Sequence, residues 1–464
     1  DAPTPERPTA AVILAAGDGT RMRSDLPKAL HAVGGAPMLV HVLQAAETLR
    51  PDRVVVVTGR GGPEVEAAAR GARADVTAVP QIERLGTGHA ARVALPALEG
   101  FDGDVFILYA DSPLFRPETL RRMAQARAAG ADVVVLGFEA ADPTGYGRLI
   151  LDAAGALARI VEHKDATEAE RATTFCNSGV VCADAQALAR LLPRITNDNA
   201  KGEFYLTDLV ALARADGLAA AAVACPEAET LGVNSRAELA AAEAAFQARA
   251  RAAAMEAGAT LTAPETVFFA LDTRLGRDVT VGPNVVFGPG AIVEDGAEIR
   301  AFCHIEGARI ASGAKIGPFA RLRPGADIGE HAVVGNFVEV KNAALARGAK
   351  ASHLTYLGDA EIGAAANIGA GTITCNYDGY LKHRTTVGAG AFIGSNTALV
   401  APVSVGAGAS VGAGSVLTED VPEDALAVAR APQEIRAGAA ARLRRRLAAL
   451  KDTLTGGSDP RKET

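Results

Sequence analysis

The sequence predicts two fold classes in one chain, an α/β domain with a mainly parallel sheet followed by a parallel β-helix. In the first half, apolar strand-like runs alternate with helix-like stretches. In the second half, aliphatic or aromatic residues recur every six residues and many are followed by Gly, a period typical of hexapeptide β-helices. We therefore expect one domain over residues 1–234, a linker helix over 235–258, and a second domain over 259–464.

The strand-like runs of the first half are continuously apolar, which is typical of strands buried on both faces of a parallel sheet. We expect strands at 10–15, 54–58, 105–109 and 133–138, with helices at 37–49, 63–70, 88–99 and 117–129. In such sheets, ligands bind outside the carboxyl ends of the strands. Two places are therefore candidates for a site: the loop after the first strand, and Asp111 at the end of another.

The loop after the first strand has the composition of a phosphate-binding loop. It reads LAAGDGTRMRSDLPKAL over residues 14–30. Gly17 and Gly19 allow a ligand close to the backbone, whose N–H groups can hold phosphate oxygens. Arg21 and Lys28 add positive charge, as a triphosphate would need. The string is neither a Walker nor a Rossmann glycine motif, and its two glycines taken alone are also compatible with a plain tight turn.

Asp111 is a candidate ligand for Mg²⁺, because this ion prefers one or two carboxylates together with phosphates and water. Asn234, in the segment GVNS, could provide a second, neutral oxygen. The alternative for Asp111 is a turn residue that simply ends its strand.

The six-residue repeat runs from Val281 to Leu417, with a single-residue slip after Ile305 and a break over 341–386. Each coil should bury one residue per flat face, with Gly at the corners. A scaffold that interrupts its own repeat often does so for a site. His353 lies in this break and is a candidate general base, since its pKa suits proton transfer near neutral pH. The residue alone would fit a solvated turn equally well.

Two further helices are expected. Residues 235–258 are rich in Ala, Glu and Arg, and Leu239, Ala242 and Phe246 form one apolar face. This segment could link the halves or belong to the first domain. Near the C-terminus, RAGAAARLRRRLAALK predicts a basic helix whose charges face solvent, and TGGSDPRKET after it has the composition of a disordered tail.

Composition excludes several classes of protein. The formal net charge of −7 argues against nucleic-acid binding, and no segment has the roughly 18 apolar residues of a membrane span. The segment before the first strand lacks the basic start of a secretory signal. Five cysteines without a CxxC pair favour free thiols in a reducing compartment over disulfides or zinc ligands. We expect a cytoplasmic protein.

Several motifs carry a family resemblance. They are the loop LAAGDGTRM, LGTGHA (85–90), YADSPL (109–114), EFYLTD (203–208), GVNSR (232–236) and, in the second half, HLTYLGDAEIG and NYDG. Together they resemble the GlmU family, bifunctional enzymes that acetylate glucosamine-1-phosphate and then uridylylate the product. The resemblance extends from the first strand to the end of the repeats. It implies a Rossmann-like nucleotidyltransferase domain followed by a left-handed β-helix.

For the first domain, the resemblance implies transfer of UMP from UTP to N-acetylglucosamine-1-phosphate with Mg²⁺ as cofactor. Arg21 and Lys28 would be catalytic through their charge on the triphosphate, and Asp111 and Asn234 would hold the metal. The residues implied to bind UTP or the UDP-sugar are Leu14, Ala15, Ala16, Gly17, Lys28, Gln81, Gly86, Thr87, Tyr109, Ala110, Asp111, Gly147, Glu162, Asn177 and Asn234.

For the second domain, the resemblance implies acetyl transfer from acetyl-CoA with His353 as general base. Glucosamine-1-phosphate would bind Arg323, Lys341, Tyr356 and Asn367, and acetyl-CoA would bind Ala370, Asn376, Tyr377, Ser395, Ala413 and Arg430. Related acyltransferases are homotrimers with active sites between subunits. Small departures from the family pattern occur at Ala110 and Asn342.

Two other hypotheses remain open at this point. The chain could be a single-activity sugar-1-phosphate nucleotidyltransferase with a structural or regulatory β-helix. It could also be a non-enzymatic scaffold with an inactive first domain, although Arg21, Lys28 and Asp111 are all present.

Overall fold

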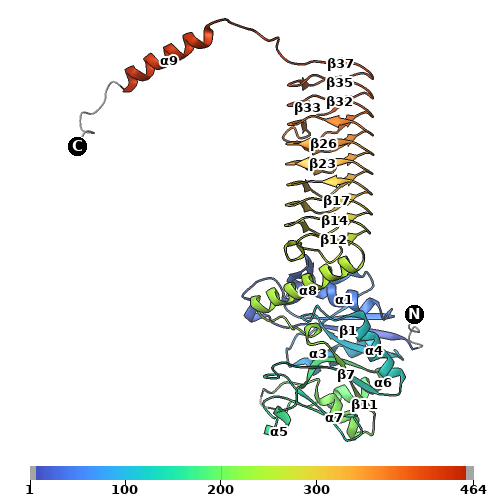
Figure 1. The fold of residues 1–464 in the computed structure, drawn as a ribbon. Helices are drawn as coiled ribbons and strands as arrows, with labels where there is room; N and C mark the ends of the chain where they lie inside the picture. The colour runs from blue at the N-terminus through green and yellow to red at the C-terminus, as the bar shows by residue number, and fades with distance from the viewer. Residues whose placement is uncertain (1–6, 200, 456–464) are drawn as a thin grey trace, which may run out of the picture.

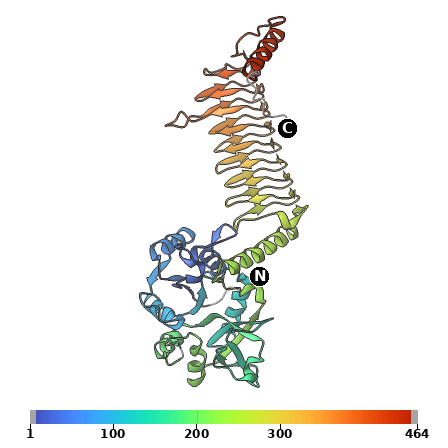
Figure 2. The same cartoon turned by 90° about the vertical axis from the view of Figure 1, so that its left-hand side faces the viewer.

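The computed structural model describes residues 7–199 and 201–455. The chain folds into a layered α/β domain and a long, straight β-helix, with helix α8 (Arg236–Glu256) between them (Figures 1 and 2). A final helix, α9 (Ala439–Thr455), extends away from the top of the β-helix.

The first domain is built on a nine-stranded sheet whose main path is β11-β7-β10-β6-β1-β4-β5, with β8 and β9 attached to β10. The strands are β1 (Thr9–Ala15), β4 (Arg53–Thr58), β5 (Thr77–Pro80), β6 (Asp104–Tyr109), β7 (Val133–Glu139), β8 (Arg148–Leu151), β9 (Leu157–Val161), β10 (Phe175–Asp184) and β11 (Ala220–Cys225). Strand β1 pairs in parallel with both β4 and β6. Strand β10 runs antiparallel between β6 and β7. The expected mainly parallel sheet is confirmed.

Helices cover both faces of this sheet, because alternate residues of each strand point to opposite sides. On one face, Val12, Val55 and Ile107 pack against α3 (Thr87–Ala94), α6 (Ala185–Leu191) and α7 (Asp208–Ala215). On the other face, Ile13 and Val56 pack against α1 (Met38–Glu47), α2 (Gly62–Ala72) and α4 (Pro117–Ala128). A one-turn helix, α5 (Glu168–Arg171), precedes β10. Each of the four expected strands and four expected helices has a counterpart.

Helix α8 belongs to both halves of the molecule. Ser235 caps its N-terminus by accepting a hydrogen bond from the Glu238 N–H. Ala242 and Phe246 are buried against residues of the first domain, where the Phe246 ring lies so close to Gly34 that a side chain there would collide with it. The next residue, Gln247, bonds to both the N–H and the carbonyl of Phe269, at the base of the β-helix.

The second half is the expected left-handed parallel β-helix, with three flat faces of ten, eight and eight strands. The ten-stranded face contains β12 (Thr260–Leu261), β14 (Thr280–Val281), β17 (Glu298–Ile299), β20 (Lys315–Ile316), β23 (Val333–Asn336), β26 (Lys350–His353), β29 (Asn367–Ile368), β32 (Phe392–Ile393), β35 (Ser410–Val411) and β37 (Leu426–Ala427). The second face contains β15 (Val286–Phe287), β18 (His304–Ile305), β21 (Arg321–Leu322), β24 (Glu339–Lys341), β27 (Tyr356–Gly358), β30 (Ile373–Cys375), β33 (Ala398–Val400) and β36 (Val416–Leu417). The third contains β13 (Arg274–Leu275), β16 (Ile292–Val293), β19 (Ala308–Ile310), β22 (Ala326–Ile328), β25 (Ala344–Leu345), β28 (Ala360–Ile362), β31 (Thr385–Val387) and β34 (Val403–Val405).

The expected break over 341–386 is wrong for most of its length. Strands β25 to β30 continue the coils there, and Leu345, Ala351, Leu357 and Ile368 are buried in the β-helix core like their counterparts in other coils. The repeat is hard to see in the sequence because some steps between inward residues are five residues, and because small or polar side chains such as Ala351 fill inward positions. The only insertion in this stretch is the loop between β30 and β31.

The terminal helix and the cysteines agree with expectation. The arginines of helix α9 are exposed, and so are its leucines Leu443, Leu447, Leu450 and Leu454. The tail predicted to be disordered lies, beyond Thr455, outside the described residues. All five cysteines are free, as expected. Within the described ranges, no helix has the length and apolar character of a bilayer-spanning segment.

Candidate active sites

A cavity of about 780 Å³ opens at the carboxyl ends of β1 and β6, where the parallel sheet places its ligands. Twelve of the residues expected to bind nucleotide or sugar line it: Leu14, Ala16, Gly17, Gln81, Gly86, Thr87, Tyr109, Asp111, Gly147, Glu162, Asn177 and Asn234. Of the other three, Lys28 contacts two lining residues without lining the cavity itself, and Ala15 and Ala110 do not line it either. Both pack with the sheet core next to lining residues, and the Ala110 N–H bonds to the Leu14 carbonyl at 3.1 Å.

Lys28 joins the two residues expected to hold the metal. It begins a short 3₁₀ helix (Lys28–Leu30), and its ammonium donates to the carboxylate of Asp111 and, at 2.6 Å, to Oδ1 of Asn234. Its side chain is only 11% exposed. Gly19 makes this position accessible, because a Cβ on Gly19 would lie 2.8 Å from that of Lys28. A carboxylate and an amide oxygen thus converge on one cationic position.

Arg21 lies elsewhere. It is exposed, in the 3₁₀ turn Thr20–Met22, and it does not line the cavity. The arginine that does line it is Arg84, which forms an ion pair with Asp18 of the glycine loop. The sequence drew attention to Arg21 because of its place in the motif, whereas Arg84 stands in a stretch without periodicity.

The far end of the cavity has the chemistry of a sugar site. The Glu162 carboxylate accepts a hydrogen bond from the Thr207 hydroxyl at 3.3 Å, and burial raises its pKa. Gly147 lies beside Glu162 and Asn177, where a side chain would press against Ile160. Burial also raises the pKa of the Tyr109 phenol well above its usual value. These groups are neutral hydrogen-bonding partners or a single carboxylate, which suits sugar hydroxyls.

His353 ends strand β26 and is exposed at the side of the β-helix. Its Nδ1 lies 2.5 Å from Oδ1 of Asn336, the residue that faces it on the neighbouring strand β23. The other ring nitrogen, Nε2, has no hydrogen-bonding partner among the described residues. Sequence analysis did not single out Asn336, because the contact depends on the coil register.

Three cations gather on the next face of the β-helix. Lys341 has a lowered pKa, caused first by the nearby ammonium of Lys382 and then by Arg323. Arg323 bonds to the Glu339 carboxylate at 2.8 Å. Because like charges held together favour an anionic ligand, this cluster is suited to a phosphate group. Arg323 and Lys341 were expected to bind phosphate, and Lys382, on the inserted loop, is an addition from the structure.

Asp359 fixes the insertion to the coils. Its carboxylate accepts hydrogen bonds from the side-chain amides of Asn342, at 2.6 Å, and Asn376. Burial opposes ionisation of Asp359, but these hydrogen bonds and the lysines Lys341 and Lys382 lower its pKa overall. The Tyr356 ring lies against Gly358, where a Cβ would collide with its hydroxyl. Beyond Asn376, the exposed Tyr377 starts the loop.

Four of the six residues expected to contact acetyl-CoA, namely Ala370, Ser395, Ala413 and Arg430, form a column that starts at His353, whereas Asn376 and Tyr377 lie at the start of the inserted loop. Backbone hydrogen bonds along one corner of the β-helix join Gly371 to His353, Asn396 to Ala370, and Gly414 to Ser395. Arg430 ends the column by donating to the carbonyl of Ala413. Asn367 lies on β29, next to β26. A long, narrow ligand could therefore lie along successive coils and end at His353.

Comparison with known proteins identifies the family of the chain. Residues 11–174 match the MobA-like NTP transferase domain, and residues 272–307 and 307–342 match the bacterial transferase hexapeptide (six repeats). The protein named Bifunctional protein GlmU from Cereibacter sphaeroides is 62% identical over 454 residues, covering 98% of this chain and 100% of the relative. The chain belongs to the GlmU family. The proteins of the same name from Rhodospirillum rubrum and Ruegeria sp. are 64% and 60% identical, covering 94% and 96% of this chain and 97% and 98% of those relatives.

This GlmU-family chain has other cavity residues that sequence analysis did not identify. Most come from loops, including those before and after the hairpin β8–β9, while Ser178 lies on β10 and Glu238 on α8. They include Asp18, Arg84, Ser112, Tyr146, His163, Lys164, Asp165, Ser178, Lys201, Glu203, Tyr205, Thr207 and Glu238. Their positions depend on how separate loops meet.

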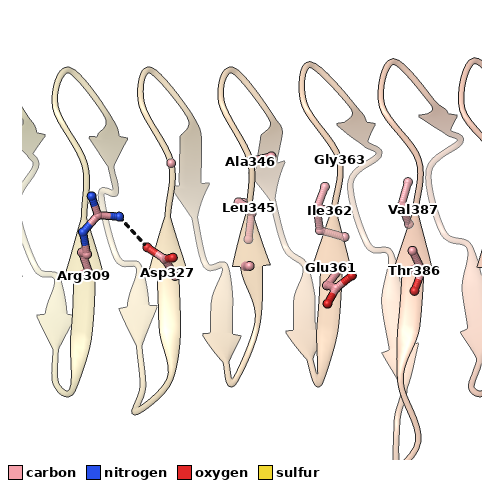
Figure 3. Close-up of a pocket in the computed structure, with 11 residues that line it drawn as sticks. Arg309, Asp327, Leu345, Ala346, Glu361, Ile362, Gly363, Thr386 and Val387 are labelled. Carbon is pink, nitrogen blue, oxygen red and sulfur yellow. Dashed lines mark hydrogen bonds and ion pairs between the residues drawn. The ribbon is translucent and has the colours of Figure 1, made fainter.

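A shallow groove of about 410 Å³ on the third face of the β-helix has no part in these sites. Arg309 and Asp327 pair across it at 3.0 Å (Figure 3), and Glu361 pairs with Arg384. None of the expected site residues lines it. Its charged groups already neutralise one another, so we assign no ligand to it.

Proposed function

We propose that this GlmU-family chain acetylates glucosamine-1-phosphate with acetyl-CoA and then transfers UMP from UTP to the product, forming UDP-N-acetylglucosamine and pyrophosphate. The observation that carries this proposal is the presence of two separate, chemically different sites in one chain. Lys28 bonds to Asp111 and Asn234 at the edge of the nucleotide cavity, whereas His353 and a cluster of three cations belong to adjacent faces of the β-helix. We assign uridylyl transfer to residues 1–234, acetyl transfer to residues 259–464, and the linker to 235–258.

In the acetyl transfer, Arg323, Lys341 and Lys382 hold the phosphate of glucosamine-1-phosphate. Nε2 of His353 takes a proton from the substrate ammonium, and the free amine attacks the carbonyl carbon of the thioester. A C–N bond forms and the C–S bond breaks. The acylated nitrogen then loses a second proton, so that one of its two protons leaves with CoA as the thiol and the other passes through His353 to solvent. Ala370, Ser395 and Ala413 leave room for the pantetheine arm along the corner, and Arg430 reaches a CoA phosphate.

In the uridylyl transfer, a phosphate oxygen of N-acetylglucosamine-1-phosphate attacks the α-phosphorus of UTP. A P–O bond forms there, and the bond to the bridging oxygen of the β-phosphate breaks in line, so that pyrophosphate leaves. Lys28 and Arg84 bring positive charge to the phosphates, and backbone N–H groups near Gly17 bind their oxygens. Glu162 and Asn177 orient the sugar. The protein contributes mainly position and charge.

The donor set at Lys28 also fits Mg²⁺. The oxygens of Asp111 and Asn234 converge on one cationic position, and one carboxylate with one amide oxygen leaves room for phosphate oxygens and water. Asp111 and Asn234 would hold the ion, which supplies further neutralisation of the triphosphate charge. Lys28 would then turn toward the phosphates.

We further propose a homotrimer formed through the β-helix. Phe302, Phe319 and Phe337 stack along one corner, with ring centroids 4.8 and 5.1 Å apart. They are 50, 45 and 55% exposed, and each has a positive φ, which is unusual for a bulky residue. A continuous exposed aromatic surface of this kind marks a protein interface. Phe337 adjoins Asn336, so a neighbouring subunit at this corner would lie close to His353.

The five free cysteines fit a reducing compartment, and we place the enzyme in the cytoplasm on that ground.

Two assays test the proposed activities. Glucosamine-1-phosphate with acetyl-CoA should release free thiol, and N-acetylglucosamine-1-phosphate with UTP and Mg²⁺ should release pyrophosphate. His353→Ala should abolish thiol release and leave pyrophosphate release unchanged. An absence of thiol release by the unmodified chain would instead support the single-activity nucleotidyltransferase.

A further inference from the structure

Asn336 is the hydrogen-bonding partner of His353. The two residues face each other across the pair β23–β26, and Asn336 Oδ1 lies 2.5 Å from His353 Nδ1. Gly335 lets these two coils approach, because a Cβ at that position would lie only 1.9 Å from the Ser352 carbonyl oxygen. Asn336 is half-buried, whereas His353 is exposed. The contact is therefore fixed by the backbone register of adjacent coils.

We infer that Asn336 is a positioning residue that sets the tautomer of His353. This inference rests on the proposed role of His353 as general base. A neutral imidazole carries one N–H, and the other nitrogen accepts. Because the Asn336 carbonyl oxygen can only accept, it selects the tautomer with hydrogen on Nδ1. The lone pair is then on Nε2, the nitrogen that must take the proton from the substrate ammonium.

An amide suits this role better than a carboxylate would. A carboxylate in its place would stabilise the imidazolium and raise the pKa of His353, so that more of the base would be already protonated near neutral pH. The neutral amide orients the ring without adding charge. A hydrogen bond to a second group is a general way to fix which imidazole nitrogen reacts.

Few charged groups near His353 could orient its ring in place of Asn336. The neighbouring strands β23 (Val333–Asn336) and β29 (Asn367–Ile368) contain no titratable residue, and neither do the corner residues 354–355 and 369–371. On its own strand, Lys350 is the one other charged residue. On the adjoining face, the carboxylate of Glu339 on β24 is paired with Arg323. Among the described residues, Asn336 is thus the only side chain that hydrogen-bonds to the ring.

The test compares Asn336→Ala and Asn336→Asp with His353→Ala in the full-length protein. Thiol release is measured as a function of pH with both substrates varied. For Asn336→Ala we expect kcat to fall about 10- to 100-fold, with KM for acetyl-CoA within about twofold. For Asn336→Asp we expect the acidic limb of the kcat/KM profile to move up by about one pH unit. Asn284→Asp, at the matching corner of an early coil, is the control and should leave the profile in place.

A second measurement reads the tautomer directly. The protein is labelled with ¹⁵N-histidine, and the ring signals of His353 are identified as those that are absent from His353→Ala. These signals should show hydrogen on Nδ1, and in Asn336→Ala they should indicate a mixture of the two tautomers.

Unchanged kcat in Asn336→Ala, an unshifted profile in Asn336→Asp, or hydrogen on Nε2 in the unmodified protein would each overturn the inference. If His353→Ala itself keeps its thiol release, the proposed general base is wrong. If His353→Ala is inactive while Asn336→Ala is normal, only the positioning role fails. Pyrophosphate release from each variant checks that the chain is folded.

Discussion

At the scale of single residues, Lys28 connects the nucleotide loop to the residues proposed to hold the metal. Its ammonium is nearly buried between Asp111 and Asn234. We expect Lys28→Met to reduce pyrophosphate release about 100-fold or more, because a preorganised positive charge at the phosphates is lost. Thiol release should not change. Lys315→Met, on the outside of the β-helix, is the matched control, and a loss of less than threefold in Lys28→Met would contradict the role.

Glu162 gives a prediction about pH and stability. Burial raises its folded-state pKa above the usual 4.5, so the folded chain binds this proton more tightly than the unfolded chain does. The free energy of unfolding therefore falls as pH rises through that raised pKa. We expect Glu162→Gln to raise the thermal unfolding midpoint of the first domain by about 2 °C at pH 8, but not at pH 4. Equal shifts at both pH values would mean that ionisation is not the cause. The same variant should weaken sugar binding.

The residues of the sites differ in how far the sequence alone could identify them. Asp111 and Lys28 follow from strand ends and a glycine loop, which are local patterns. Arg84, Lys201 and Lys382 lie on loops whose sequence shows no periodicity, and they reach the sites through tertiary structure. Asn336 contacts His353 only because the coils pair in a particular register. A single sequence does not show which residues of neighbouring coils will be paired.

At the scale of elements, the inserted loop after β30 is held by Asp378. Its carboxylate accepts hydrogen bonds from the N–H groups of Tyr380 and Leu381, and it lies 2.7 Å from Nε2 of His383. The hydrogen bond to His383 is the main reason why the pKa of Asp378 falls to about 2. The carboxylate therefore supports the loop above a pH of about 4, and this support is lost as pH falls toward 2.

From this arrangement we expect Asp378→Ala to loosen the loop and displace Lys382. The value of kcat/KM for thiol release should fall about tenfold, while pyrophosphate release stays the same. Asp272→Ala, which removes a comparable backbone contact at Gly290, should leave both activities unchanged. If Asp378→Ala behaves like this control, the loop has no part in acetyl transfer.

The elements themselves were largely predictable, with one instructive failure. Strands such as β1 and β6 are long apolar runs, and α8 has a regular apolar face, so both were expected. The apparent break in the β-helix was an error, because Ala351 can fill an inward position as well as a larger residue does. Hydrophobic periodicity detects large inward side chains, whereas the coils are held together by backbone hydrogen bonds that any residue can make.

At the scale of the whole molecule, the stacked phenylalanines predict the assembly. We expect light scattering to show a trimer for the unmodified chain and a monomer for Phe337→Glu, since a charge would be buried in an apolar interface. Thiol release should be lost with the trimer, and pyrophosphate release should remain. Leu151→Glu, an exposed leucine of the first domain, is the control. A trimer that survives Phe337→Glu would place the interface elsewhere.

The single insertion between β30 and β31 has a consequence for how such a chain can change over time. Strand pairing resumes directly after it, with Thr385 opposite Ala360 and Val387 opposite Ile362, so the added residues disturb neither the coil below nor the coil above. Corners of the β-helix are thus places where segments can be gained, lost or exchanged while the frame stays intact. Substrate preference in such an enzyme can evolve by local replacement at a corner, separately from selection on the stability of the fold.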